Sequence, residues 1–139
     1  MNTIVTVPGF DSFTAQHVFD TAARHLLSQK KRAYGKKENG GHSCLYNGPD
    51  GTSCAAGVFI EPQYRAAADK HGSWGGVVGA GMASRANYDL IRNLQIIHDD
   101  ALDEWSHAVT VAFWSGELRS LAESYRLNED AIDEMLTGS

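Results

Sequence analysis

The chain has 139 residues, of which 42% are hydrophobic and 21% charged, a composition that suits one globular domain with a core of its own. No run of 18 apolar residues occurs, so no membrane-spanning helix is expected, and residues 1–10 hold no basic residue, so no secretory signal peptide is expected. Lys and Arg number 12 against 17 Asp and Glu, a net charge of −5, which argues against non-specific binding to nucleic acid.

The two cysteines, Cys44 and Cys54, are expected to be reduced thiols that do not bond to each other, because no secretion signal is expected and a reducing compartment keeps thiols free. A structural zinc site takes four ligands, and the sequence contains no second pair of cysteines. The sequence therefore predicts no metal and no cofactor.

The N-terminal part predicts an extended arm and then a helix. Residues 1–11 include β-forming residues that stop at Pro8-Gly9. Thr14 is suited to cap a helix that ends in the basic stretch after Gln29. Apolar residues recur along this helix at helical spacing and are expected to face the core: Val18, Phe19, Ala22, Ala23, Leu26 and Leu27.

A β-hairpin is predicted over residues 43–60. Pro49-Asp50-Gly51 has turn chemistry, because proline presets its own φ and glycine accepts a positive φ. The flanking residues 43–47 and 52–55 would be the paired strands. A brief helix is expected at 63–69, and the glycine-rich residues 72–83 are expected to form a mobile or close-contact loop.

Three further helices are predicted in the second half of the chain, at about 85–98 after the cap Ser84, at about 102–125, and from the cap Asn128 onward. Their expected core residues are Leu90, Ile91, Leu94 and Ile97, and then Trp105, Val109, Ala112 and Phe113. The predicted fold class is a single mainly helical α+β domain over residues 1–139, a bundle of four to five helices with one β-hairpin packed against it.

Three residues form a candidate catalytic set for a cysteine-dependent hydrolase or transferase. Cys54 follows a tight turn, and a helical turn beginning there would lower the pKa of its thiol. His98 and Asp99 supply an imidazole base and a carboxylate to orient it. The structural alternative is a packed thiol at position 54, with His98 closing one helix and Asp99 or Asp100 capping the next.

His-Asp is also the central pair of a metal-dependent phosphohydrolase motif, for which His71 and either Asp130 or Asp133 would complete the ligand set. A two-residue motif recurs by chance, and His71 is expected in a loop. The sequence therefore predicts no metal site from this motif.

The glycine-rich segment offers a candidate binding site. Gly79 and Gly81 precede the N-terminal end of a predicted helix, where backbone N–H groups bind anions. Trp74 fits no helical stripe, so it is either a ligand or partner contact or a side chain that fills the core beneath the loop.

The middle of the chain resembles a family of small phage, prophage and bacterial proteins without an assigned activity. The matching segments are Cys44-Leu45-Tyr46, Gly48-Pro49-Asp50-Gly51, Cys54-Ala55-Ala56-Gly57, Leu94-Gln95-Ile96-Ile97-His98-Asp99 and Trp105. The resemblance covers residues 30–127 and departs from the family at Val58, where the family has a third cysteine. Because the Cys54 stretch and the Gln95–Asp99 stretch recur together, we expect them to meet in space, with Gln95 or His98 bonded to the backbone of the 43–60 region or to Tyr46.

Two functions are expected from these features. The first is a small acidic accessory protein of a phage or mobile element, in the bacterial cytoplasm, which binds a small ligand or a host protein, for instance to inhibit a host defence. Its ligand-binding residues would be Tyr46, Trp74, Gly79, Gly81, Gln95 and His98. The alternative is the enzyme that uses Cys54, His98 and Asp99. Neither membrane nor nucleic-acid partners are expected, and self-association into a homo-oligomer is left open.

Overall fold

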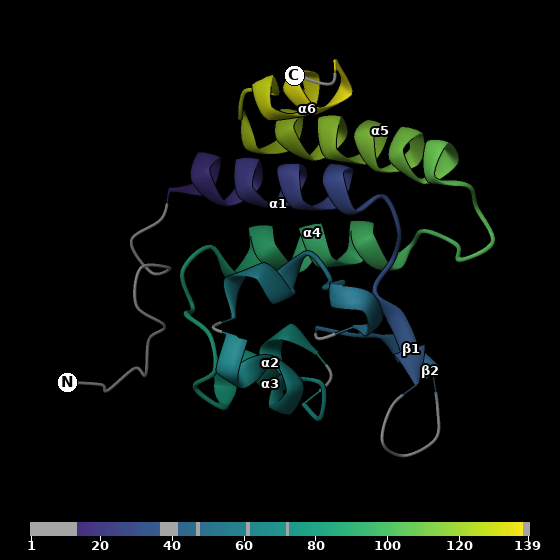
Figure 1. Cartoon of the computed structure of the whole chain (residues 1–139). Helices are drawn as coiled ribbons and strands as arrows, with labels where there is room; N and C mark the ends of the chain where they lie inside the picture. The colour runs from purple at the N-terminus through teal and green to yellow at the C-terminus, as the bar shows by residue number, and fades with distance from the viewer. Residues whose placement is uncertain (1–13, 37–41, 47, 61, 72, 138–139) are drawn as a thin grey trace.

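The computed structural model describes residues 14–36, 42–46, 48–60, 62–71 and 73–137. The α-helices in this part of the chain are α1 (Ala15–Gln29), α2 (Pro62–Ala68), α3 (Trp74–Gly79), α4 (Tyr88–Asp99), α5 (His107–Tyr125) and α6 (Asp130–Leu136) (Figure 1). Two short strands, β1 (Tyr34–Lys36) and β2 (His42–Cys44), and two 3₁₀ turns, η1 (Pro49–Gly51) and η2 (Ala56–Phe59), lie between α1 and α2. The arm predicted at 1–11 lies outside the described residues.

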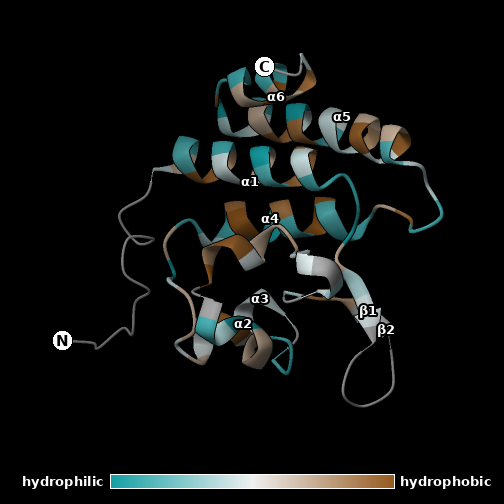
Figure 2. Ribbon diagram, in the orientation of Figure 1, coloured by the Kyte–Doolittle hydropathy of each residue, from teal (hydrophilic) through white to brown (hydrophobic). Residues whose placement is uncertain are grey.

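The helices form a bundle around α1, as predicted. α1, α4 and α5 contact one another pairwise, and α6 packs on α1 and α5. In Figure 1, α4 lies on one side of α1, α5 and α6 lie on the other, and α2 and α3 lie beyond α4. Figure 2 shows that the helices alternate hydrophilic and hydrophobic residues along their length. Among the helices described, none combines the length and the apolar composition needed to cross a bilayer.

The cap and the buried face of α1 are the ones that the sequence predicts. The Thr14 hydroxyl accepts a hydrogen bond from the N–H of His17 at 3.1 Å, and Lys30 ends the helix in a left-handed conformation with φ of 66°. All six residues of the predicted apolar stripe are buried. A capping residue and a helical repeat of apolar residues are thus sufficient to place this helix.

The hairpin predicted over 43–60 is wrong. Strand β2 pairs with β1, with Tyr34 opposite Cys44, and none of the described residues between 48 and 60 forms a strand. Pro49–Gly51 forms a 3₁₀ turn that is closed by a hydrogen bond from Thr52 N–H to the Pro49 carbonyl. The small residues that follow have weak strand preference, and side chains of α1 and α4 satisfy their backbone groups instead.

The loop predicted over 72–83 contains a helix. α3 begins after Ser73, whose hydroxyl accepts a hydrogen bond from Gly76 N–H at 3.2 Å. A Cβ atom at position 76 would lie 2.7 Å from the carbonyl oxygen of His71. Glycine at this position therefore allows α3 to pack closely on the turn after α2, a role that local sequence patterns do not reveal.

α4 begins later than predicted. Ser84 does not cap it, since its hydroxyl accepts a hydrogen bond from Ala86 N–H, and the helix starts at Tyr88 after Asn87 adopts a left-handed φ of 58°. Asparagine tolerates this conformation better than most residues. The predicted core residues Leu90, Ile91, Leu94 and Ile97 are all buried, so the predicted face of α4 is correct.

The predicted face of α5 is wrong. Its buried residues are Thr110, Trp114, Ser115, Leu118 and Ala122, whereas Val109 and Ala112 are exposed. Trp105 and Phe113 are half-buried and pack edge to face with ring centroids 5.2 Å apart. α5 begins at His107, and Ser106 caps it. α6 begins at Asp130, whose N–H donates to the side chain of the predicted cap Asn128.

Candidate functional site

His98 links the C-terminal end of α4 to the segment that follows α1. Its ring is fully buried, because it lies one helical turn beyond Leu94 on the inward face of α4. Nε2 accepts a hydrogen bond from the backbone N–H of Ala33 at 2.9 Å, and Nδ1 lies 2.8 Å from Asp99 Oδ1. The ring also stacks against Trp114, with centroids 5.8 Å apart.

These two contacts fix the tautomer of His98. A backbone N–H can only donate, so Nε2 must present its lone pair and Nδ1 must hold the proton that it donates to Asp99. Burial lowers the pKa of His98 below its ordinary value of 6.5, against the opposing effect of the Asp99 carboxylate. The ring is therefore neutral at pH 7, and no lone pair remains for a general base or a metal ligand.

Gln95 lies one turn before Asp99 and joins α4 to the segment that contains Cys54. Its Oε1 accepts a hydrogen bond from Ala56 N–H at 2.9 Å, and its Nε2 donates to Asp99 Oδ1 at 2.9 Å. This confirms that the end of α4 meets the 43–60 region in space. Gln95 makes the contact to that region, whereas His98 binds Ala33.

Two residues of α1 bind the same region from the other side. His25 Nε2 lies 2.7 Å from the carbonyl oxygen of Ser53 and must donate to it, and Gln29 Oε1 accepts a hydrogen bond from Ser53 N–H at 2.9 Å. We call the five side chains His25, Gln29, Gln95, His98 and Asp99 the polar seam. Its α1 members, His25 and Gln29, were not predicted as site residues, although their spacing of four residues beside the buried stripe was a usable signal.

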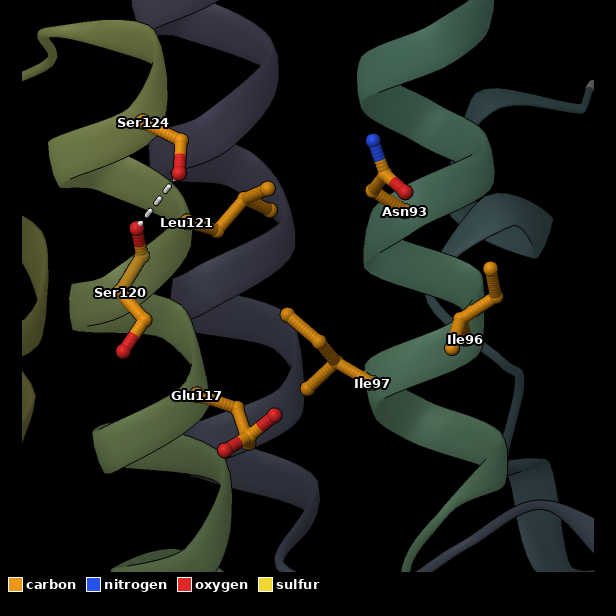
Figure 3. Close-up of a pocket in the computed structure, with 7 residues that line it drawn as sticks. All are labelled: Asn93, Ile96, Ile97, Glu117, Ser120, Leu121 and Ser124. Carbon is orange, nitrogen blue, oxygen red and sulfur yellow. Dashed lines mark hydrogen bonds between the residues drawn. The ribbon is translucent and has the colours of Figure 1, made fainter.

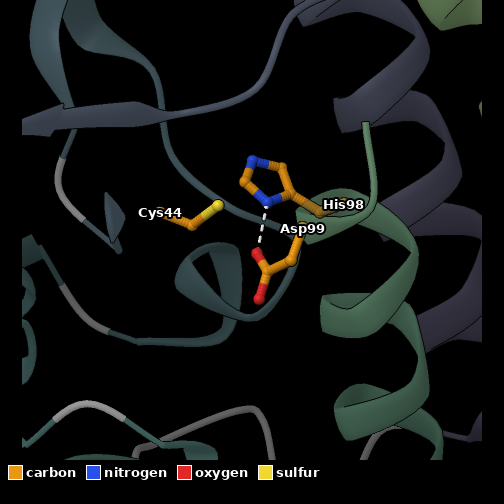
Figure 4. Close-up of side chains that lie close together, drawn as sticks. All are labelled: Cys44, His98 and Asp99. Carbon is orange, nitrogen blue, oxygen red and sulfur yellow. Dashed lines mark hydrogen bonds and ion pairs between the residues drawn. The ribbon is translucent and has the colours of Figure 1, made fainter. Parts of the chain in front are cut away.

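Cys44, and not the predicted Cys54, lies beside His98 and Asp99. One ligand-type atom from each of these three residues lies within 4.8 Å of the others, and Figure 4 shows the sulfur facing the imidazole and the carboxylate. Burial, followed by the charge and the hydrogen bond of Asp99, raises the pKa of the Cys44 thiol to about 12. At pH 7 the thiol is protonated and is a poor nucleophile.

Cys54 is fully buried in the hydrophobic core. Burial is the largest cause that raises the pKa of its thiol, and it outweighs the hydrogen bonds from the Gly57 backbone and the Gln95 side chain that favour the thiolate. The pKa shift is thus opposite in direction to the one predicted from a helical turn at this position. As predicted, the two cysteines form no disulfide.

Two of the residues predicted to bind a ligand, Tyr46 and Trp74, take part in packing. Tyr46 and Trp74 are buried with ring centroids 6.3 Å apart, and burial raises the pKa of the Tyr46 hydroxyl. Trp74 therefore fills the core, the second of its two predicted roles. Gly79 is the exposed last residue of α3, and Gly81 adopts a φ of 79° in the turn after it. A ligand-binding role for these residues stays a prediction.

The phosphohydrolase ligand set does not assemble. His71 is exposed in the turn after α2, and Asp133 on α6 pairs with Arg119 at 2.7 Å. Among the described residues, Cys44, His98 and Asp99 make the only close group of metal-ligating types. Because His98 Nδ1 is protonated in this group, two ligands are left, which is fewer than a zinc site uses.

The polar seam can hold backbone groups in place but offers no thiolate, and the lone pair of His98 is already occupied by the Ala33 N–H. Arg32 extends it at the surface, where it donates to the Asp99 carbonyl and to Asp103 and covers the ring of Tyr34. Comparisons of the chain with protein-family models, curated proteins and solved structures found no match.

Proposed function

We propose that this chain is a phage- or mobile-element-type accessory protein that acts by binding a small ligand or a host protein rather than by catalysis. The non-catalytic part rests on one observation, the hydrogen bond from Ala33 N–H to His98 Nε2. That bond occupies the lone pair with which a cysteine hydrolase would take up the thiol proton. The phage-type part rests on the resemblance of residues 30–127.

The competing proposal, an enzyme that uses Cys54 with His98 and Asp99, has weaker support. Cys54 is fully buried, so a substrate would reach it only after the core opened. Cys44 is closer to the imidazole, but its pKa of about 12 leaves it protonated. Binding needs neither a thiolate nor a base, so it is compatible with everything described for the polar seam.

Thiol reactivity tests this proposal. The native full chain is treated with a disulfide reagent such as DTNB at pH 7, with glutathione as the reference thiol, and Cys44→Ser and Cys54→Ser assign the two rates. We expect Cys44 to react more slowly than glutathione and Cys54 to react only after unfolding, because protonated and buried thiols are inert. If either thiol reacts faster than glutathione, the enzyme replaces the binding protein as the better proposal.

A further inference from the structure

A groove of about 270 Å³ lies between α4 and α5, outside the polar seam. Figure 3 shows that Ile97 and Leu121 point toward each other across it, with the Glu117 carboxylate at one end and Asn93 at the other. Its lining residues are Asn93, Ile96, Ile97, Glu117, Ser120, Leu121 and Ser124. Its volume is just below the range of about 300–1,000 Å³ that is typical of drug-sized ligands, so a ligand that fits would be small.

The groove combines an apolar wall with charge of one sign. Ile96 is 44% exposed and is among the large hydrophobic residues most open to solvent. Glu117 is the only charged residue in the lining, and within the described residues it forms no ion pair. By contrast, Glu129 and Asp133 pair with Arg119, and Glu134 pairs with Arg24.

The hydrogen-bonding groups of the groove can also accept from a ligand that donates. Asn93 uses its amide nitrogen to donate to the Tyr125 hydroxyl, and the Ser124 hydroxyl donates to the Ser120 carbonyl. Asn93 Oδ1 and the Glu117 carboxylate remain as acceptors. No lining residue carries a positive charge, so an anionic ligand would face repulsion without compensation.

We propose that this groove binds a small organic ammonium ion with an apolar tail. The ammonium group pairs with Glu117, and the tail covers Ile97 and Leu121. A neutral apolar ligand would bury the carboxylate without a partner, which is costly, whereas a cation satisfies it, and the net charge of −5 favours its approach. This inference rests on the proposed binding function and names its site and ligand class.

The test is a titration of the ¹⁵N-labelled full chain with hexylammonium at pH 7, with hexanoate as the probe of opposite charge. We expect hexylammonium to shift the amide signals of the lining residues and hexanoate to leave them unchanged. Glu117→Gln should weaken hexylammonium binding by about two- to fivefold, the size expected of one partly exposed ion pair. Glu123→Gln, on an exposed part of the same helix, is the matched control and should leave the affinity unchanged.

Three results would overturn this inference: no shift at the lining residues, equal shifts with hexanoate, or equal weakening by Glu117→Gln and Glu123→Gln. With slow thiol reactivity, any of these would leave a binding protein whose site lies elsewhere. Fast thiol reactivity would overturn the proposed function itself, whatever the groove binds. The two experiments therefore fail separately.

Discussion

His98 uses both of its ring nitrogens to hold structure. One accepts from the Ala33 backbone and the other donates to Asp99, and Asp99 Oδ1 also accepts from Gln95. A histidine followed by an aspartate suggests a base and its orienting group in a sequence. In this protein the same pair satisfies a buried N–H that would otherwise lack an acceptor.

Replacing His98 should therefore reduce stability. His98→Ala leaves the Ala33 N–H buried without an acceptor, and we expect the free energy of unfolding to fall by about 1–3 kcal/mol. Urea denaturation of the full chain measures this. His107→Ala, at an exposed position at the start of α5, serves as the control and should change little. Equal effects of the two substitutions would contradict the buried hydrogen bond.

The buried His98 and the half-buried His25 should also make the protein sensitive to acid. Burial lowers the pKa values of His25 and His98 below 6.5 in the folded chain. Below pH 6.5 the unfolded chain takes up protons that the folded chain does not, so stability falls as pH decreases toward the folded-state pKa values. The maximum slope is about 1.4 kcal/mol per pH unit for each histidine.

Urea midpoints at pH 7.5, 6.5 and 5.5 measure this slope. In His98→Gln the slope between pH 6.5 and 5.5 should be smaller than in the parent chain, because one of the two groups is gone. If stability stays constant or increases as the pH falls from 6.5 to 5.5, the two histidines cannot both be neutral in the folded chain.

At the scale of elements, α3 depends on glycine at one position and not at another. Gly76→Ala should destabilise the chain by about 1–3 kcal/mol, since its Cβ would lie 2.7 Å from the His71 carbonyl oxygen and force a shift. Gly79→Ala has open space around its Cβ and should stabilise the chain by about 0.4–1 kcal/mol. Thermal melting of the two variants distinguishes these effects, and a gain of stability from Gly76→Ala would show that α3 does not pack as described.

The buried face of α5 is tested by comparing Trp114, within the helix, with Trp105, which precedes it. Trp114 is fully buried, and its indole N–H donates to the Ile97 carbonyl at 3.0 Å. Trp114→Ala should cost about 3–5 kcal/mol, whereas Trp105→Ala, at a half-buried site before the helix, should cost about 1–2 kcal/mol. Chemical denaturation measures both, and the reverse order would restore the face predicted from the sequence.

The sequence predicts elements well where one local pattern decides them. α1 and α4 each have a single apolar stripe, and their buried residues match it. α5 has two candidate stripes offset by one residue, Val109-Phe113 and Thr110-Trp114-Leu118. Which stripe faces inward depends on the packing of α1 and α4 around it, and the period alone cannot choose between them.

The predicted hairpin failed for a related reason. A turn at Pro49–Gly51 exists, but Ser53 and Ala56 bond to side chains of α1 and α4 that are distant in sequence. The candidate site was only partly predictable for the same reason, because it also depends on contacts between residues distant in sequence. The meeting of Gln95 with the 43–60 region could be predicted, but the proximity of Cys44 to Asp99 depends on the β1–β2 pairing, which turn chemistry did not indicate.

Across the whole molecule, the polar seam joins parts that lie far apart in the chain. α1 supplies His25 and Gln29, α4 supplies Gln95, His98 and Asp99, and the irregular segment between β2 and α2 lies between them (Figure 1). This segment has little regular structure of its own, so side chains must satisfy its buried backbone groups. His25, Gln29 and Gln95 thus hold this segment between α1 and α4, and His98 holds the chain that follows α1.

The tautomer of His98 tests this account most directly. A long-range ¹H–¹⁵N correlation spectrum of the histidine rings in the full chain at pH 7 distinguishes a protonated ring nitrogen from one with a lone pair. We predict a neutral ring with the proton on Nδ1 and the lone pair on Nε2, held by the Ala33 N–H. A proton on Nε2, or protons on both nitrogens, would contradict the structural role and would reopen the case for His98 as a base.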